Sequence, residues 1–140
     1  MSDDSSNLQK HDDCITGQDL KHANAFIGSF RYAAEGVAAA WGERNFKVDC
    51  IFAVIAIILC VLLRVPLWGW AVVTVCIGVQ LALETVNTAI EAVVDLASPQ
   101  LQPLAKRAKD CAAGAALITA CVSIAIACIV YIPALLNLCA

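Results

Sequence analysis

The stretch Glu84-Thr85-Val86-Asn87-Thr88-Ala89-Ile90-Glu91-Ala92-Val93-Val94-Asp95 places three carboxylates and one amide in a segment that otherwise has the composition of a membrane helix. At about 100° per residue, positions 84, 87, 91 and 95 fall within roughly 80° of one another on a helical wheel. One face of the predicted helix is therefore polar and acidic, and the remainder is mainly apolar. Because ionisable groups at membrane depth are costly and are usually kept for a function, we expect the chemistry on that face.

The composition of the whole chain indicates an integral membrane protein. Its 140 residues are 61% hydrophobic and 15% charged, whereas a soluble domain is about half apolar and a quarter charged. Eight of the nine Lys and Arg residues gather in two patches, with only Arg64 elsewhere, and they form no extended basic face, which argues against a nucleic-acid partner. Of the eight cysteines, the five that lie within apolar helical runs show no CxxC spacing and no neighbouring His ligands; they are Cys50, Cys60, Cys76, Cys121 and Cys128. We therefore interpret them as packing residues of membrane helices, not as a disulfide or metal framework.

The distribution of apolar residues predicts an all-α membrane protein, with an N-terminal amphipathic surface helix followed by three transmembrane helices. The surface helix is expected at residues 21–46, where large apolar residues recur at helical spacing between charged ones. The spans are expected at about 48–68, 70–96 and 111–136, and each is long enough for a hydrocarbon core of roughly 30 Å.

The basic patches also predict how the chain is oriented in the membrane. One patch precedes the first span and the other lies between the second and third spans, so the positive-inside rule places both in the cytoplasm. The N-terminus is then inside and the C-terminus outside. We expect residues 1–20, which are polar and acidic, to be a disordered cytoplasmic tail, and residues 21–140 to be a single membrane domain.

Carboxylates and a lysine at the cytoplasmic boundary are suited to a metal-bound phosphate donor. Mg²⁺ usually binds one or two protein carboxylates together with substrate phosphates, and Glu43 and Glu91 are candidates for that pair. Lys109 would neutralise phosphoryl charge. Glu84 lies about two turns deeper on the same face, where it would take a proton from a lipid hydroxyl. The chain has no Gly-rich phosphate loop, so spacing alone does not establish a kinase.

A non-enzymatic interpretation competes with this one. An intramembrane carboxylate can form a buried contact between helices, and Glu84 and Glu91 would also suit an oligomeric, proton-coupled exporter subunit. An exporter, however, needs neither the Lys109-Asp110 pair at the interface nor Glu43 outside the membrane. A kinase needs all of them, and nucleotide binding separates the two classes.

Four stretches of the chain resemble the prokaryotic diacylglycerol kinase family. Residues 84–95 are similar to its central motif, and residues 104–115, residues 29–36 and Glu43-Arg44-Asn45-Phe46 also fit. The likeness runs from about Phe26 to the C-terminus. It implies a protein of the bacterial cytoplasmic membrane with a surface helix and three spans. It further implies a homotrimer whose active sites are shared between subunits and which uses Mg-ATP to phosphorylate a membrane lipid alcohol.

The resemblance also implies roles for individual residues. Glu84 matches the family's general base, and Glu43 and Glu91 match the residues that hold Mg²⁺. The residues that match positions near the nucleotide are Tyr32, Lys109, Asp110 and, more weakly, Gln100 and Gln102. Asn87 and Asp95 match further residues of the central motif.

Three phrases bear on the lipid substrate. Glu43-Arg44-Asn45-Phe46, Asp95-Leu96-Ala97-Ser98 and Ile132-Pro133 resemble the undecaprenol kinase branch found in Gram-positive bacteria. We therefore expect undecaprenol as the substrate, with diacylglycerol as the alternative.

Overall fold

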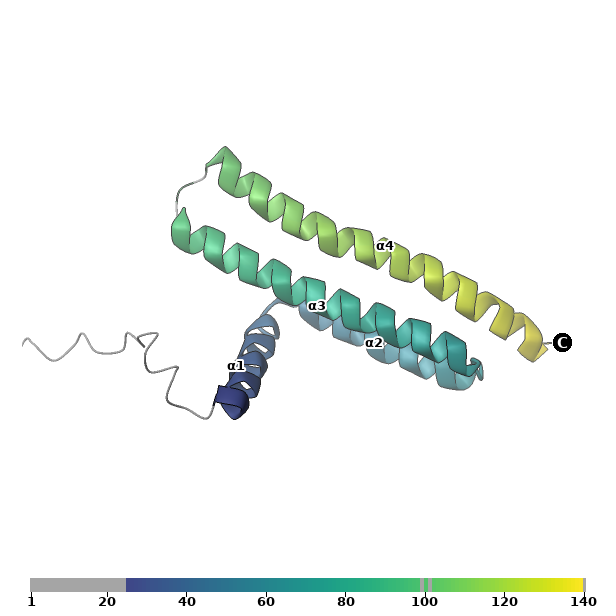
Figure 1. Cartoon of the computed structure of the whole chain (residues 1–140). Coiled ribbons are helices and arrows are strands. Elements are labelled where there is room, and N and C mark those ends of the chain that lie inside the picture. The colour runs from purple at the N-terminus through teal and green to yellow at the C-terminus, as the bar shows by residue number, and fades with distance from the viewer. Residues whose placement is uncertain (1–24, 99, 101, 140) are drawn as a thin grey trace, which may run out of the picture. The chain divides into compact units, whose positions relative to one another are not determined.

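The computed structural model describes residues 25–98, 100 and 102–139, and these residues form α-helices without any strand (Figure 1). The predicted all-α fold class is thereby confirmed. The expected tail at residues 1–20 lies outside the described residues. The helices are α1 (Ala25–Ala40), α2 (Arg44–Leu62), α3 (Leu67–Ala97) and α4 (Pro103–Cys139).

Three of these helices are long and apolar enough to cross a membrane, namely α2, α3 and α4. They lie alongside one another, and α3 packs against both of the others, most extensively against α4 (Figure 1). Many of their large apolar side chains point outward and are exposed. Such a surface suits contact with the apolar chains of lipids. The helices also suit the bilayer core because their backbone hydrogen bonds are internal, and the core has no water to replace them.

The helix α1 precedes the spans, and at 16 residues it is shorter than the roughly 20 residues that a span requires. The expected surface helix reached residue 46, but α1 ends at Ala40 because the backbone tightens there. The N–H groups of Gly42 and Glu43 donate to the carbonyls of Ala39 and Ala40 at 3.0 and 2.9 Å, which is the short-range pattern of a helix end. Residues up to Glu35 form a separate unit from those that follow.

The α2–α3 connection explains why α2 ends at Leu62, before the expected boundary at residue 68. Arg64 adopts the left-handed conformation with φ 50°. Its N–H donates to the carbonyl of Val61 at 3.2 Å, and the N–H of Val65 donates to the carbonyl of Cys60 at 3.0 Å. This is the hydrogen-bond pattern of a Schellman motif, which satisfies the last carbonyls of a helix.

The apolar core that fixes the three spans lies beside this connection. It is built from Cys60, Val65, Val73 and Val130, which are all buried. Next to them the Tyr131 hydroxyl of α4 donates to a backbone carbonyl of α2, that of Ala56, at 3.0 Å. The acidic face of α3 begins further along the helix, so this core holds α3 in place without using the polar residues.

Candidate active site

The polar face of α3 is buried at its centre. Glu84 and Asn87 are each 4% exposed, and no other polar or charged residue in the described part of the chain is as well covered. The neighbouring hydroxyls are satisfied within the helix, because Thr88 Oγ1 donates to the Glu84 carbonyl at 3.1 Å and Thr85 Oγ1 to the Leu81 carbonyl at 2.8 Å. Glu84 and Asn87 are therefore the buried polar side chains of this face that stand out from its satisfied hydroxyls.

Two side chains from the start of α2 lie near Glu84. The Asn45 side chain lies within hydrogen-bonding reach of the Glu84 carboxyl group, and the charges of Asp49, Glu91 and Glu43 also act on it. The predicted carboxylates Glu43 and Glu91 are thus close enough to Glu84 for their charges to act on it, and Glu43 has the smallest effect. Glu43 owes this position to the turn between α1 and α2.

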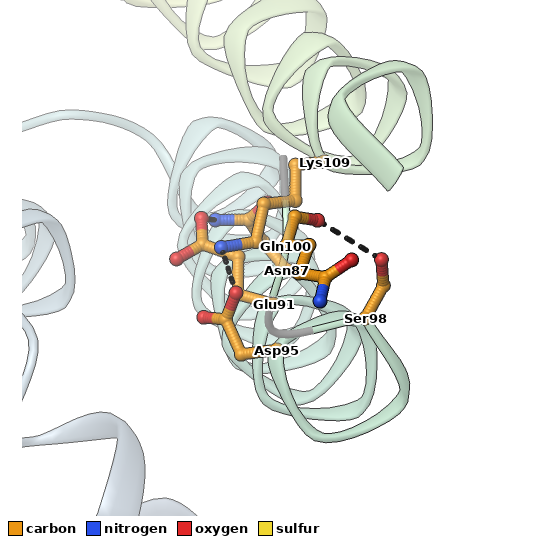
Figure 2. Close-up of polar contacts among 6 residues, drawn as sticks. All are labelled: Asn87, Glu91, Asp95, Ser98, Gln100 and Lys109. Atoms are coloured by element: carbon orange, nitrogen blue, oxygen red, sulfur yellow. Dashed lines mark hydrogen bonds and ion pairs between the residues drawn. The ribbon is translucent and has the colours of Figure 1, made fainter. Parts of the chain in front are cut away.

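Glu91 and Asn87 form the next contact along the same face (Figure 2). Asn87 Nδ2 donates to Glu91 Oε1 at 3.1 Å. The other amide atom, Asn87 Oδ1, is buried and has no hydrogen-bond partner among the described residues. Buried polar atoms are normally paired, so this oxygen is available to a group that enters the site.

Lys109, the predicted cationic residue of the site, lies at the boundary between α3 and α4. Lys109 Nζ donates to Asp95 Oδ1 at 2.6 Å, which joins the start of α4 to the end of α3 (Figure 2). Lys106 forms a similar ion pair of 2.6 Å with Asp110 within α4. Both pairs lie at the same end of the helices as Glu91.

A small pocket of about 180 Å³ lies at this boundary. It brings together five predicted site residues, and it adds Ser98 and Lys106 to them. The polar residues that line it are Asp95, Ser98, Gln100, Gln102, Lys106, Lys109 and Asp110. Part of its rim is fixed locally, because Ser98 Oγ donates to the carbonyl of Gln100 at 3.1 Å (Figure 2).

Glu43 and Tyr32 lie outside the contacts described above. Glu43 is the N-cap residue of α2, but its side chain makes no capping hydrogen bond, so the carboxylate is not used by the helix end. Tyr32 lies in the first unit, where the Arg31 guanidinium is 5.1 Å from the centre of its ring. The structure therefore describes Tyr32 with its neighbours on α1 and not together with the other site residues.

Sequence reasoning missed three polar residues beside Glu84. Asn45 and Asp49 are on α2, and no spacing rule connects them to a motif on another helix. Gln80, in contrast, carried a usable signal, because it precedes Glu84 by one helical turn and shares its face. Being uncharged, it was not singled out.

The donor set near Glu91 has the chemistry that Mg²⁺ prefers. Within the described residues, no three His, Cys, Asp or Glu side chains are arranged as a metal site. Mg²⁺ is commonly held by only one or two carboxylates, with substrate phosphates completing its shell. The carboxylates of Glu43 and Glu91 and the unpaired Asn87 Oδ1 are all oxygen donors, so these residues fit such an ion.

The three apolar helices contain a buried carboxylate, and a pocket lined by ion pairs lies at one end of them. These features define an integral membrane protein with a polar site at the edge of its spans. The model of the prokaryotic diacylglycerol kinase family matches residues 31–131. The chain belongs to this family, as its motifs predicted.

Individual relatives agree with the assignment. The chain is 38% identical to the undecaprenol kinase of Bacillus subtilis over 80% of its own length and 92% of the relative's. It is 40% identical to a diacylglycerol kinase of Synechocystis over 79% of its own length, spanning 64% of that relative. It is 30% identical to the diacylglycerol kinase of Escherichia coli K12 over 70% of its own length and 81% of the relative's. The protein is therefore a membrane lipid kinase, and the family implies ATP as co-substrate. The exporter interpretation finds no support in these likenesses.

Proposed function

We propose that this kinase transfers the γ-phosphate of ATP to undecaprenol, with diacylglycerol as the alternative acceptor. The likenesses to the Bacillus and Synechocystis relatives are of similar identity, so they do not by themselves select the lipid. The proposal of undecaprenol rests on the three phrases that resemble the undecaprenol kinase branch. The match over 92% of the Bacillus undecaprenol kinase supports it.

The observation that carries the mechanism is the burial of Glu84 within a helix long and apolar enough to span the membrane. We assign Glu84 the role of general base. The hydroxyl oxygen of the lipid attacks the γ-phosphorus while its proton passes to the Glu84 carboxylate. The bond between the γ-phosphorus and the bridging oxygen breaks, and ADP leaves. A positioned base typically contributes about 10²–10⁴-fold to such a step.

We assign Glu43 and Glu91 the role of holding Mg²⁺, which when bound neutralises charge on the phosphates. The hydrogen bond from Asn87 fixes the orientation of the Glu91 carboxylate. Asn87 therefore acts on the metal site through Glu91, and its own Oδ1 is buried without a hydrogen-bond partner among the described residues.

We place the nucleotide beside the pocket at the α3–α4 boundary. Phosphoryl transfer depends chiefly on positioning and charge stabilisation, and Lys109 supplies a positive charge there. Asp110, Gln100 and Gln102 line the same pocket and offer hydrogen-bonding groups. Asp95 holds Lys109 toward the polar face of α3. Tyr32 is assigned to the nucleotide from the family resemblance alone.

The assembly and the orientation are further parts of the proposal. We propose a homotrimer in the bacterial cytoplasmic membrane, with the N-terminus inside and the C-terminus outside. Residues 21–140 would act as one membrane domain, with residues 1–20 as a cytoplasmic tail. The positions of the basic patches support the orientation. The trimer rests on the family resemblance, which also implies active sites shared between subunits.

The test of the proposed function is phosphate transfer from labelled ATP by the detergent-purified protein. Undecaprenol and diacylglycerol are offered in parallel, with and without Mg²⁺. Preferential phosphorylation of undecaprenol is the expected result. Preference for diacylglycerol would keep the mechanism and refute the choice of lipid. Absence of product from both lipids, with folded protein and Mg²⁺ present, would refute the proposed function.

A further inference from the structure

A second cavity lies between α2, α3 and α4, nearer to the α2–α3 connection than the candidate active site is. Its volume is about 380 Å³, which is within the range of small-molecule sites. On α3 it runs from Val73 to Leu81, and its lining is overwhelmingly apolar, with residues such as Phe52, Ile77 and Ala127. An occupant of this cavity must therefore be mainly apolar itself.

One end of the cavity is polar, and one atom there lacks a partner. Gln80 Nε2 donates to Asp49 Oδ2 at 3.0 Å, which joins α3 to α2. Gln80 Oε1 is buried, and none of the described residues donates to it. Because a buried acceptor without a donor is unfavourable, the cavity is suited to a molecule that brings one donor group and an apolar body.

The position of Gln80 relates this cavity to the proposed chemistry. Gln80 and Glu84 lie on one face of α3, separated by one turn, or about 6 Å along the helix axis. The Asp49 carboxylate, which holds the Gln80 amide, also acts electrostatically on Glu84. A hydroxyl group held at Gln80 is therefore one helical turn from the carboxyl group assigned as the base.

We propose that the cavity receives the hydroxyl-bearing end of the lipid alcohol and that Gln80 is the positioning residue for that hydroxyl. The hydroxyl donates to Gln80 Oε1 on entry and then advances along α3 to Glu84. This inference rests on the proposed function, whose acceptor is an apolar molecule with a terminal hydroxyl. A helix of a second copy fits the cavity less well, because its backbone N–H groups are already used within the helix.

The test compares the kinetics of Gln80→Met with those of the unchanged protein. Methionine retains the length of the side chain and removes the amide. We expect the KM for the lipid alcohol to rise about five- to tenfold, as for the loss of one hydrogen bond. The kcat and the KM for Mg-ATP should stay within about twofold. Thr119→Val is the control, because the Thr119 hydroxyl donates within α4 to Ala115 and does not line the cavity.

A binding measurement keeps the inference testable without catalysis. A long-chain alcohol that carries a photoreactive diazirine near its hydroxyl should label Phe52 and Ile77 in the unchanged protein. Ala127→Phe, which fills the cavity, should abolish this labelling, and Gln80→Met should weaken it. Labelling confined to other residues would overturn the inference even if the protein proves to be an active undecaprenol kinase. So would a fall in kcat for Gln80→Met with an unchanged lipid KM. Conversely, cavity labelling by a protein without kinase activity would refute only the proposed function.

Discussion

At the scale of single residues, the surroundings of Glu84 and Glu91 differ in a way that fits the separate roles proposed for them. Glu84 is buried beside Asn45 and Asp49, whereas Glu91 is partly exposed and accepts a hydrogen bond from Asn87. A buried carboxylate next to an apolar cavity is placed for a lipid hydroxyl. A more open carboxylate near the end of α3 is placed for a metal-bound nucleotide.

This difference predicts distinct effects of two substitutions. Glu84→Gln should lower kcat by at least about 10²-fold, because the base is lost, while Mg-ATP binding remains nearly unchanged. Glu91→Gln should weaken Mg-ATP binding itself, because an oxygen ligand loses its charge. Nucleotide binding, measured by calorimetry in detergent, and turnover with the preferred lipid check both outcomes. Equal loss of binding in the two variants would contradict the division of roles.

The sequence reveals only part of the site at this scale, for a physical reason. Helical periodicity groups residues on one helix, so Glu84, Asn87, Glu91 and Asp95 are predictable from spacing alone. Contacts between helices depend on packing, which spacing does not contain. Asp49 is an example, since its hydrogen bond to Gln80 crosses from α2 to α3.

At the scale of elements, the end of α2 is held in a conformation that its sequence does not favour. Arg64 has φ 50°, a region that glycine adopts readily and other residues adopt at a cost of roughly 1–2 kcal/mol. Arg64→Gly should therefore stabilise the protein by about 1 kcal/mol, although the greater freedom of glycine in the unfolded chain offsets part of the gain. Thermal unfolding in detergent measures the change. A lower midpoint of thermal unfolding would show that the arginine side chain stabilises the fold by more than its left-handed backbone conformation costs.

A glycine near the start of α3 has a different role. A Cβ atom at Gly69 would overlap Val65 Cγ1 and lie 3.1 Å from Val130 Cγ1. Gly69→Ala should therefore destabilise the bundle by about 1–3 kcal/mol, as overpacking does. Gly78→Ala is the matched control on the same helix, because a Cβ there meets nothing within 4 Å. It should stabilise by up to about 1 kcal/mol through helix propensity. Equal effects of the two substitutions in the unfolding assay would contradict this account of Gly69.

The elements themselves are largely predictable, and their ends are not. Length and apolar composition are sufficient to predict three spans and a preceding helix. The apolar spacing of residues 21–46 continues through Trp41, so it gave no sign that α1 stops at Ala40. The break is made by backbone hydrogen bonds at Gly42 and Glu43, which periodicity does not encode.

At the scale of the whole molecule, the polar residues gather at one end of the spans and the apolar core at the other. Lys109 and Asp95 lie at the α3–α4 boundary, whereas Val65 and Val73 lie near the α2–α3 connection. The proposed orientation places the first end in the cytoplasm, where ATP is available. It also directs the Arg64 turn to the outer surface.

This orientation predicts which positions are accessible from outside the cell. Leu67 and Leu104 are both highly exposed and lie at the starts of α3 and α4. In a cysteine-free background, a membrane-impermeant maleimide should label Leu67→Cys in spheroplasts. It should label Leu104→Cys only after the membrane is permeabilised. The reverse pattern would invert the proposed topology, and labelling of both positions before permeabilisation would show a leaky membrane or a mixed orientation.

The ion pair between Lys109 and Asp95 has a consequence for turnover. The side chains are 34% and 67% exposed, and an ion pair this open to water stabilises by no more than about 1 kcal/mol. On the proposed function, Asp95 serves as an internal competitor that occupies the lysine between catalytic cycles. An arriving phosphate displaces it at a cost of roughly fivefold in affinity. The same carboxylate recaptures the lysine when ADP departs, so product release is assisted by the chain itself.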